Sequence, residues 1–304
     1  MIPLALITGF LGSGKTTLLR RIIDGNRHRR LAYLVNEFSM LDVDSRRLTD
    51  AGKDLFCLPG GSIFCRCLVT SFINQLRDIA ELNNSSDAPL QGLVIEASGV
   101  ADPRVVGQML GETRLDEYYR LARMVCVVDP GTFPILLNTL PNIAAQIESA
   151  DLAIVNKTDL FDEPTLAGVE RTVRDIQPTI EVARASYAAV DFDLFATACR
   201  PDVTGGYAPC RDDRYDREVF ATDRPVDIHR LMAEAAGLLD GAYRIKGVVW
   251  DGTATHHLDW SPTSRMTISP TIDDARRTEL AAVFPPAARE RMVGFFNRLG
   301  AGNP

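Results

Sequence analysis

A glycine-rich stretch near the N-terminus constrains the fold of this chain more than any other feature of its sequence. Residues 9–17 read Gly-Phe-Leu-Gly-Ser-Gly-Lys-Thr-Thr and fit the phosphate-binding pattern G-x-x-x-x-G-K-[ST]. An apolar, β-prone run precedes this stretch at residues 2–8, and a helical pattern follows it from Thr17 to Ile23. A phosphate-binding loop needs this order, because the N–H groups of the loop and the helix N-terminus bind the phosphate oxygens together. The stretch therefore predicts a P-loop within a nucleotide-binding α/β domain.

Each residue type in the loop has a different expected role in nucleotide binding. Lys15 places a positive charge on the β- and γ-phosphates, and the hydroxyl group of Thr16 is a ligand for Mg²⁺. The glycines let the backbone approach the phosphates closely, because they carry no Cβ atom. The predicted nucleotide-binding residues of the loop are Gly9, Gly12, Ser13, Gly14, Lys15, Thr16 and Thr17.

Short apolar runs alternate with helical patterns over the first two thirds of the chain. The runs after the P-loop cover residues 31–35, 55–58, 92–95, 124–128 and 152–155. Helical spacing appears at residues 68–82 and 165–176. Strands that alternate with helices predict a doubly wound parallel sheet of the α/β class. Polar residues follow several of these strands, at the edge where open α/β sheets bind ligands.

Asn156-Lys157-Thr158-Asp159 follows one of the predicted buried strands and indicates the identity of the base. The carboxylate of Asp159 can accept hydrogen bonds from the N1–H and the exocyclic amine of guanine, and adenine does not present both donors in that arrangement. The stem of Lys157 can lie over the face of the base. The segment predicts binding of GTP and GDP, with Asn156, Lys157 and Asp159 at the base.

Two acidic residues at strand ends are candidates for the hydrolytic chemistry. Glu96 is expected to hold Mg²⁺ or to orient the attacking water, and Gly99 is expected to offer its N–H to the γ-phosphate. Glu37 follows an earlier strand and is the candidate switch acid. The predicted catalytic residues are Lys15, Glu37, Glu96 and Gly99, and the predicted Mg²⁺ ligands are Thr16 and Glu96.

The composition changes near Arg200, which predicts a boundary between two domains. We expect a P-loop domain at residues 1–198, a linker rich in glycine and proline at 199–217, and a smaller α+β domain at 218–304. In the smaller domain, the patterns predict strands at 218–220, 243–250 and 256–260, a helix at 226–239 capped by Asp227, and mostly helical structure at 271–299.

Charge and hydropathy restrict the partners of the chain. The net charge of −7 argues against a general nucleic-acid or membrane-surface role. No apolar run approaches the roughly 18 residues that a membrane span needs. Met1 leads directly into a strand without the basic region of a signal peptide, and six cysteines are too few for a disulfide scaffold. We therefore expect a cytoplasmic monomer or homodimer with reduced thiols.

Together these motifs resemble the CobW-type GTPases of the SIMIBI class, metallochaperone relatives of the nickel-insertion GTPases of urease and hydrogenase. The segments that carry the resemblance are residues 8–19, 35–38, 96–103, 156–159, 224–225 and 243–247. The resemblance covers nearly the whole chain. It implies a slow, Mg²⁺-dependent GTPase whose nucleotide state couples to metal binding and to docking on a client metalloprotein or cofactor-pathway enzyme.

The chain departs from this family where a transition-metal site is expected. The family carries Gly-Cys-x-Cys-Cys after the third strand, whereas this chain reads Gly61-Ser62-Ile63-Phe64-Cys65, with Cys67 two residues further on. The switch of the family continues with Gly-Glu, where this chain has Ser39-Met40. Cys65 and Cys67 remain as candidate ligands for Zn²⁺ or Co²⁺, although tetrahedral Zn²⁺ needs four ligands. An acid or Cys57 would have to complete the site, and Cys57 is expected to face the core.

Other potential ligands have simpler interpretations. His256 and His257 are adjacent in a predicted strand and point to opposite faces, so at most one could serve a given metal site. We expect exposed hairpin histidines. Cys126 lies in a predicted central strand, where we expect an inert core residue.

Three functional hypotheses follow. The first is a GTP-hydrolysing switch that couples its nucleotide state to the delivery of a metal or metallocofactor. The alternative, which the incomplete cysteine motif supports, is a metal-free regulatory or chaperone GTPase that docks on a metal- or corrinoid-dependent enzyme. A third hypothesis, an ATP-dependent P-loop kinase, conflicts with the guanine-binding segment.

Overall fold

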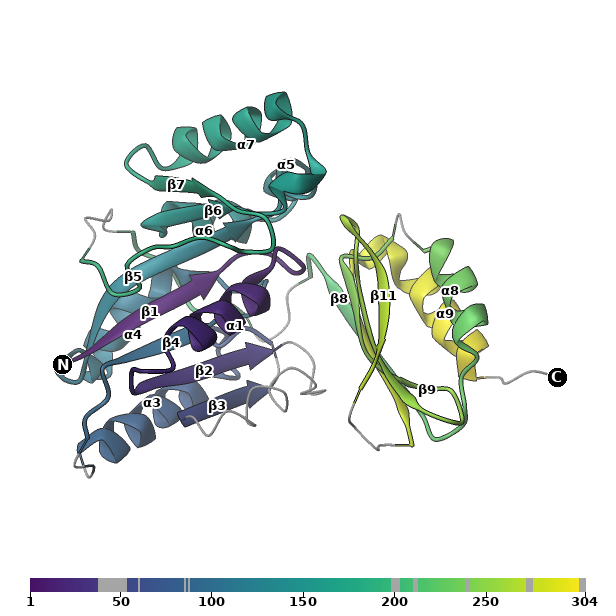
Figure 1. Ribbon diagram of the computed structural model, residues 1–304, viewed down its shortest axis with the longest axis horizontal. Coiled ribbons are helices and arrows are strands. Elements are labelled where there is room, and N and C mark those ends of the chain that lie inside the picture. The colour runs from purple at the N-terminus through teal and green to yellow at the C-terminus, as the bar shows by residue number, and fades with distance from the viewer. Residues whose placement is uncertain are drawn as a thin grey trace. The chain divides into compact units, whose positions relative to one another are not determined.

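The computed structural model describes residues 1–300 with the exception of 38–53, 60, 85, 87, 198–202, 210–212, 239–240 and 272–275. The chain divides into two compact units at residues 210–211. The first unit contains a seven-stranded sheet and the second a five-stranded sheet (Figure 1). None of the described helices is both long and apolar enough to cross a membrane.

All strands of the first sheet run parallel, in the order β3-β2-β4-β1-β5-β6-β7. The strands are β1 (Ile2–Thr8), β2 (Leu31–Glu37), β3 (Asp54–Pro59), β4 (Gly92–Glu96), β5 (Tyr119–Val128), β6 (Leu152–Val155) and β7 (Glu181–Arg184). The helices are α1 (Lys15–Gly25), α3 (Val69–Asn84), α4 (Val106–Glu112), α5 (Phe133–Leu137), α6 (Pro141–Glu148) and α7 (Glu163–Ile176). This architecture confirms the predicted doubly wound α/β fold.

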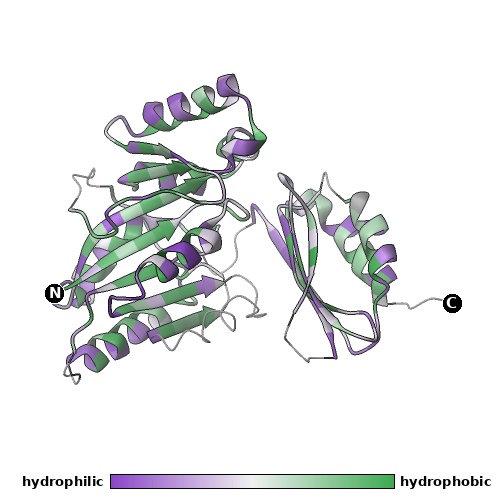
Figure 2. Cartoon of the chain, viewed as in Figure 1, coloured by the Kyte–Doolittle hydropathy of each residue, from purple (hydrophilic) through white to green (hydrophobic). Residues whose placement is uncertain are grey.

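Strand β1 lies at the centre of the sheet and contributes to the packing on both faces. Leu4 packs in one apolar cluster with Phe72 of α3, and Ile7 packs in another with Leu18 of α1. Successive side chains of a strand point to opposite faces, so a strand covered by helices on both sides must be apolar throughout. Figure 2 shows the hydrophobic residues concentrated in the central strands of this sheet.

The strand order reverses its direction at β1. The chain builds β2, β3 and β4 on one side of β1 and then crosses to β5, β6 and β7 on the other side. At such a switch point the loops after neighbouring strands diverge and leave a crevice at the carboxyl ends of the strands, where ligands bind. The P-loop follows β1 at this point of the sheet.

The second unit is a five-stranded antiparallel sheet, in the order β11-β10-β9-β12-β8, packed against two helices. Its elements are β8 (Asp216–Thr222), α8 (Ile228–Ala236), β9 (Arg244–Trp250), β10 (Thr255–Ser261), β11 (Ser264–Pro270), β12 (Thr278–Phe284) and α9 (Arg289–Gly300). The predicted hairpin of β9 and β10 is confirmed. Asp227 caps α8 as predicted, because its side chain accepts hydrogen bonds from the N–H groups of His229 and Arg230.

The prediction of mostly helical structure at residues 271–299 is wrong for β12. Leu280, Ala282 and Phe284 alternate toward the core of the second unit, which is the period of a strand. The segment pairs with β8 on one side and with β9 on the other. Pairing on both edges outweighs the helical preference of the Leu-Ala-Ala sequence, and the helix begins only at Arg289.

The expectation of exposed hairpin histidines is also wrong, because neither residue is exposed. His257 is buried within β10, a strand that has neighbours on both sides. His256 is half-buried, and its Nε2 lies 2.7 Å from Oδ2 of Asp251.

Candidate nucleotide-binding site

The P-loop adopts a backbone that only glycine accommodates easily. Gly9, Gly12 and Gly14 have φ angles of 131°, 79° and 112°. A Cβ atom on Gly14 would lie 2.3 Å from Nδ2 of Asn156, and one on Gly9 would lie 2.3 Å from the carbonyl oxygen of Val127. Both glycines are therefore required by the close approach of β5 and the loop after β6, as well as by their φ angles.

The side chains of the predicted phosphate and Mg²⁺ ligands lie at the start of α1. Lys15 is the first residue of this helix, and its Nζ donates to the carbonyl oxygen of Phe10 at 3.1 Å. The hydroxyl group of Thr16 donates to Oε1 of Glu96 at 2.9 Å, and Glu96 is buried at the end of β4. A hydroxyl and a carboxylate oxygen are ligand types that Mg²⁺ prefers. The structure thus brings together two residues that lie 80 positions apart, and their oxygens fit the ion.

Asn36 joins three segments next to the P-loop. Its side-chain amide donates to the carbonyl oxygens of Leu58 and Gly61 at 3.1 and 3.0 Å. Its Oδ1 accepts from the N–H groups of Ile63 and Ser98, both at 3.1 Å. All four hydrogen-bonding positions of the amide are filled, so the residue fixes the end of β2, the turn after β3 and the segment after β4 relative to one another.

Gly99 lies against the P-loop, and its role at the γ-phosphate stays a prediction. A Cβ atom at this position would come within 2.5 Å of the backbone nitrogen of Leu11. The side-chain amide of Gln146 donates to the carbonyl oxygen of Gly99 at 3.2 Å and holds this segment in place. Glu37 is the last residue of β2, and its role as switch acid stays a prediction, because its side chain and residues 38–53 lie outside the described part of the chain.

The predicted base-binding loop is anchored to the P-loop through Asn156. The side-chain amide of Asn156 donates to the carbonyl oxygen of Ser13 at 2.8 Å, and its Oδ1 accepts from the N–H of Ala188 at 2.8 Å. Lys157 has a φ of 59° and forms an ion pair with the buried Asp129, with 2.7 Å between Nζ and Oδ2. Asp159 lies exposed in the short turn that follows. The two predicted halves of the site are therefore one connected structure.

The sequence motifs assign no role to Asp129, and they do not indicate that the segment after β7 belongs to this region. Ala185 accepts from the N–H of Thr158 at 3.1 Å, and the hydroxyl groups of Thr158 and Ser186 lie 2.9 Å apart. Tyr187 and Ala188 both have positive φ angles, which is uncommon for residues other than glycine. The missed signal is β7 itself, whose sequence Glu-Val-Ala-Arg is too polar to stand out as a strand.

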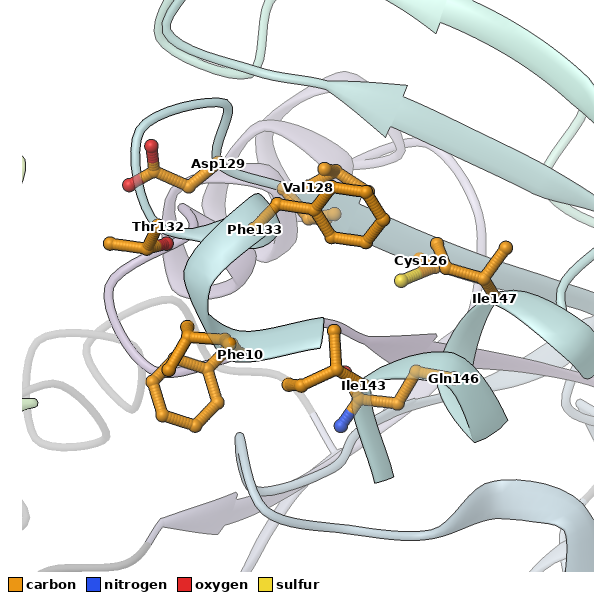
Figure 3. Close-up of a pocket in the computed structure, with 11 residues that line it drawn as sticks. Phe10, Cys126, Val128, Asp129, Thr132, Phe133, Ile143, Gln146 and Ile147 are labelled. Atoms are coloured by element: carbon orange, nitrogen blue, oxygen red, sulfur yellow. The ribbon is translucent and has the colours of Figure 1, made fainter. Parts of the chain in front are cut away.

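A small, mostly apolar pocket lies beside the P-loop, and its lining includes the polar residues Asp129 and Gln146. Figure 3 shows Phe10, Phe133 and Ile143 around this pocket, with the carboxylate of Asp129 at its edge. Cys126 also lines it, and burial raises the pKa of the Cys126 thiol to about 12. This agrees with the expectation of an inert core cysteine.

The cysteines on β3 and in the turn after it (the cysteine turn, residues 61–68) differ from the sequence-based expectation in two ways. Cys65 and Cys67 are joined by a disulfide, whereas reduced thiols are expected. Cys57 is exposed on β3 rather than facing the core, because β3 is the edge strand of the sheet. The described residues contain no group of three or more His, Cys, Asp or Glu side chains placed to hold a metal ion. Metal binding by Cys65 and Cys67 stays a prediction for their reduced form.

Comparison with known proteins connects this geometry to one family. Residues 3–184 match the family model described as the CobW/HypB/UreG nucleotide-binding domain. The chain is 28% identical over 269 residues to the zinc chaperone YjiA of Escherichia coli (strain K12), with 82% of each chain covered. It is 29% identical over 198 residues to the zinc-regulated GTPase metalloprotein activator 1 of Schizosaccharomyces pombe, which covers 62% of this chain and about half, 47%, of that relative. The crystal structure of the Zn(II)-bound YjiA GTPase from E. coli aligns with a TM-score of 0.48 at 22% identity, over 98% of both chains.

Proposed function

The chain belongs to the CobW/HypB/UreG family, and we propose that it is a GTP-hydrolysing switch that couples its nucleotide state to the delivery of a metal ion or metallocofactor. The observation that carries this proposal is the bridge that Asn156 forms between the P-loop and the segment after β7. This bridge ties the predicted phosphate-binding loop to the predicted guanine-binding loop, which supports their use by one nucleotide.

Hydrolysis uses the residues around the start of α1. Lys15 and the N–H groups of the P-loop hold the β- and γ-phosphates, and Thr16 and Glu96 would hold Mg²⁺. When bound, the ion neutralises charge on the phosphate oxygens. Glu37 or Glu96 orients a water for in-line attack on the γ-phosphate, and Gly99 donates its N–H to the oxygen charge that develops. The chemistry needs no covalent intermediate, and the proposed rate is slow.

The nucleotide state reaches the cysteine turn through Asn36. Ser98 lies beside Gly99, and its N–H donates to Oδ1 of Asn36. The same oxygen accepts from Ile63, two residues before Cys65. A displacement at Gly99 on loss of the γ-phosphate therefore has a short, hydrogen-bonded path to the two sulfur atoms.

The names of the relatives favour zinc as the delivered ion, and Co²⁺ is the alternative. YjiA is described as a zinc chaperone, and the S. pombe relative as a zinc-regulated activator of metalloproteins. By this analogy the partner is a client metalloprotein or an enzyme of a cofactor pathway. The thiolates of Cys65 and Cys67 would contribute to a site for this cargo when reduced.

One observation favours the metal-free alternative. Two of the three expected thiolates are replaced by Ser62 and Phe64, and both replacements are buried. A buried phenyl ring cannot ligate a metal. The chain would then act on its target enzyme through docking alone, with the same nucleotide cycle.

Two measurements test these proposals. Phosphate release should be Mg²⁺-dependent and clearly faster from GTP than from ATP, and this preference should be lost in Asp159→Ala. Equal turnover of ATP would overturn the GTPase assignment.

Equilibrium Zn²⁺ titrations of the nucleotide-free, GDP-bound and GTP-analogue-bound protein should give different affinities. If the Cys65→Ser/Cys67→Ser double variant binds Zn²⁺ as well as the wild type in every state, the thiols are not the metal site and the docking alternative is favoured.

A further inference from the structure

The disulfide between Cys65 and Cys67 lies in the turn that leads from β3 to α3. The Cα atoms of the two residues are 5.4 Å apart, and the carbonyl oxygen of Cys65 accepts from the N–H groups of Leu68 and Val69 at 3.1 and 2.9 Å. Val69 is the first residue of α3, so the sulfur pair directly precedes the N-terminus of a 16-residue helix. A sulfur anion at this place is stabilised by the partial positive charge of the helix end.

The surroundings of the pair support chemistry by two sulfurs rather than by a larger ligand set. The Phe64 side chain is fully buried, and its ring packs edge-on against Phe72, with 5.8 Å between the ring centroids. The N–H of Phe64 donates to the hydroxyl oxygen of Ser62 at 3.2 Å. Both residues are thus built into the core side of the turn, and they leave Cys65 and Cys67 as its two sulfur-bearing positions. Two thiols separated by one residue can lose two electrons together and form one bond.

The two cysteines differ in their access to solvent. Cys65 is 4% exposed, whereas Arg66 and Cys67 are exposed. An external thiolate therefore reaches the sulfur of Cys67, and the sulfur of Cys65 is the leaving group beside the helix end. Arg66 adds a positive charge that favours the approach of an anionic thiolate.

We propose that Cys65 and Cys67 form a reversible dithiol–disulfide site that exchanges with external dithiols. A thiolate of the dithiol bonds to the sulfur of Cys67, and the Cys65–Cys67 bond breaks with its electron pair on the sulfur of Cys65, which takes a proton. The second thiol of the reagent then attacks the first sulfur of the reagent, which is bonded to Cys67 in the mixed disulfide. The sulfur of Cys67 is released and is also protonated. The protein gains two electrons and two protons, and the reagent leaves as a disulfide.

The exchange also acts on a backbone segment that we call the strap, residues 205–208. The N–H of Ala208 donates to the carbonyl oxygen of Phe64, and the N–H of Arg66 donates to the carbonyl oxygen of Ala208, both at 3.0 Å. These two bonds flank Cys65 on either side. The hydroxyl group of Tyr207 donates to Glu112 at 3.1 Å and ties the strap to α4. Opening the disulfide frees the turn to move, so the two backbone bonds to Ala208 weaken in the reduced protein.

The exchange itself does not depend on the nucleotide or on a metal. Its consequence for metal delivery rests on the proposed function, because only the reduced form offers two thiolates to a metal ion. In the oxidised form both sulfurs are withdrawn from coordination. The site would therefore allow metal loading under reducing conditions and prevent it under oxidising conditions.

The test of the exchange is a redox titration of the full chain in mixtures of reduced and oxidised dithiothreitol, followed by acid quenching, alkylation and tryptic digestion. Trypsin cleaves after Arg66, between the two cysteines, so a peptide that ends at Arg66 stays linked to one that starts at Cys67 only when the disulfide is present. We expect the linked species to disappear in one two-electron transition, while two alkylated peptides appear together. The amides of Arg66 and Ala208 should exchange hydrogen at least tenfold faster in the reduced form.

A matched variant controls for the third cysteine in the same peptide. Cys57→Ser should leave the transition unchanged, whereas Cys67→Ser should abolish it. Alkylation of both cysteines at every dithiothreitol ratio would overturn the proposal, and so would a linkage that involves Cys57. Equal hydrogen exchange in both forms would overturn the effect on the strap.

A spectroscopic titration separates this proposal from the proposed function. Co²⁺ bound by thiolates absorbs in the near ultraviolet by charge transfer, so Co²⁺ added to the reduced protein should produce this band, and Co²⁺ added to the oxidised protein should not. A redox transition without any band in the reduced form would retain the exchange site and reject the metal role of the thiols. A band of equal strength in both forms would reject the gating of metal by the disulfide.

Discussion

The ion pair of Lys157 and Asp129 joins the predicted base-binding loop to the end of β5. Asp129 is buried at the end of β5, accepts from the N–H of Gly131 at 3.1 Å, and fixes Nζ of Lys157 at 2.7 Å. Lys157 itself has a left-handed backbone conformation, which costs a residue other than glycine about 1 kcal/mol or more. A lysine held in this way at both its backbone and its side chain is positioned before the nucleotide arrives.

Asp129→Asn should weaken guanine-nucleotide binding by about tenfold, which corresponds to about 1.4 kcal/mol. Asparagine keeps the shape and can still accept from Gly131, but it removes the charge that orients Lys157. Titration with a fluorescent GDP analogue measures the change. Asp162→Asn is the matched control, because Asp162 caps α7 on the exposed side and asparagine caps a helix as well as aspartate does. Equal affinity of the Asp129→Asn variant and the wild type would show that the ion pair does not position Lys157.

Cys126 gives the protein a pH dependence with a defined sign. Burial raises the pKa of its thiol to about 12, whereas a thiol in the unfolded chain titrates near 8.5. The folded state therefore holds this proton more tightly, and stability that is fully present below pH 8.5 is lost as the pH rises toward 12. The raised pKa of Tyr33, also about 12, acts in the same direction but only above pH 10.

Between pH 8 and pH 10 the free energy of unfolding should fall by about 2 kcal/mol because of Cys126 alone. Urea denaturation at several pH values measures this loss, and the loss should be smaller in Cys126→Ala. In the native protein at pH 9, iodoacetamide should modify the exposed Cys57 and leave Cys126 unmodified. Rapid alkylation of Cys126 in the native state would contradict its assignment to the core.

A strand or helix can be predicted from the sequence when the spacing of its apolar residues reflects its own burial. β4 is buried at all five residues, and its continuous apolar sequence identifies it as a central strand. β7 and β12 are not predicted, since the first is a polar edge strand and the second becomes a strand only through pairing with β8 and β9. The same limit applies to the site. The P-loop and the Asn156 segment are recognisable from residue types, whereas the contacts of Asn36 and the strap join residues far apart in the chain.

A glycine substitution tests how closely β9 and β12 approach each other in the second unit, and a second glycine substitution serves as its control. Gly247 in β9 has a φ of 156°, and a Cβ atom there would lie 2.1 Å from the carbonyl oxygen of Glu279 in β12. Gly247→Ala should therefore destabilise the second unit by several kcal/mol, because the two strands would have to separate. Gly168→Ala in α7 is the control, since its Cβ atom meets nothing within 4 Å and alanine stabilises a helix interior by up to about 1 kcal/mol. Thermal denaturation should show opposite signs for the two variants, and a neutral Gly247→Ala would contradict the close approach of β9 and β12.

The predicted nucleotide-binding residues all lie in one of the two compact units of the chain. The P-loop, Glu96 and Asn156 all belong to the first unit, whereas the core of the second unit is built from its own sheet, α8 and α9. Compact units with separate cores unfold in separate transitions unless a large interface couples them. A ligand of the first unit then stabilises that unit alone.

GDP should raise the unfolding temperature of the first unit and leave that of the second unit unchanged. At a free GDP concentration of 100 times the dissociation constant, the stabilisation is about 2.7 kcal/mol, because the ligand binds only the folded state. Differential scanning calorimetry measures both transitions, and hydrogen exchange assigns them: protection should increase in β1 and β6 and stay constant in β9 and β12. Gly247→Ala should shift the other transition only, which identifies it without ligand. A single transition that GDP displaces as a whole would instead show that the two units unfold together.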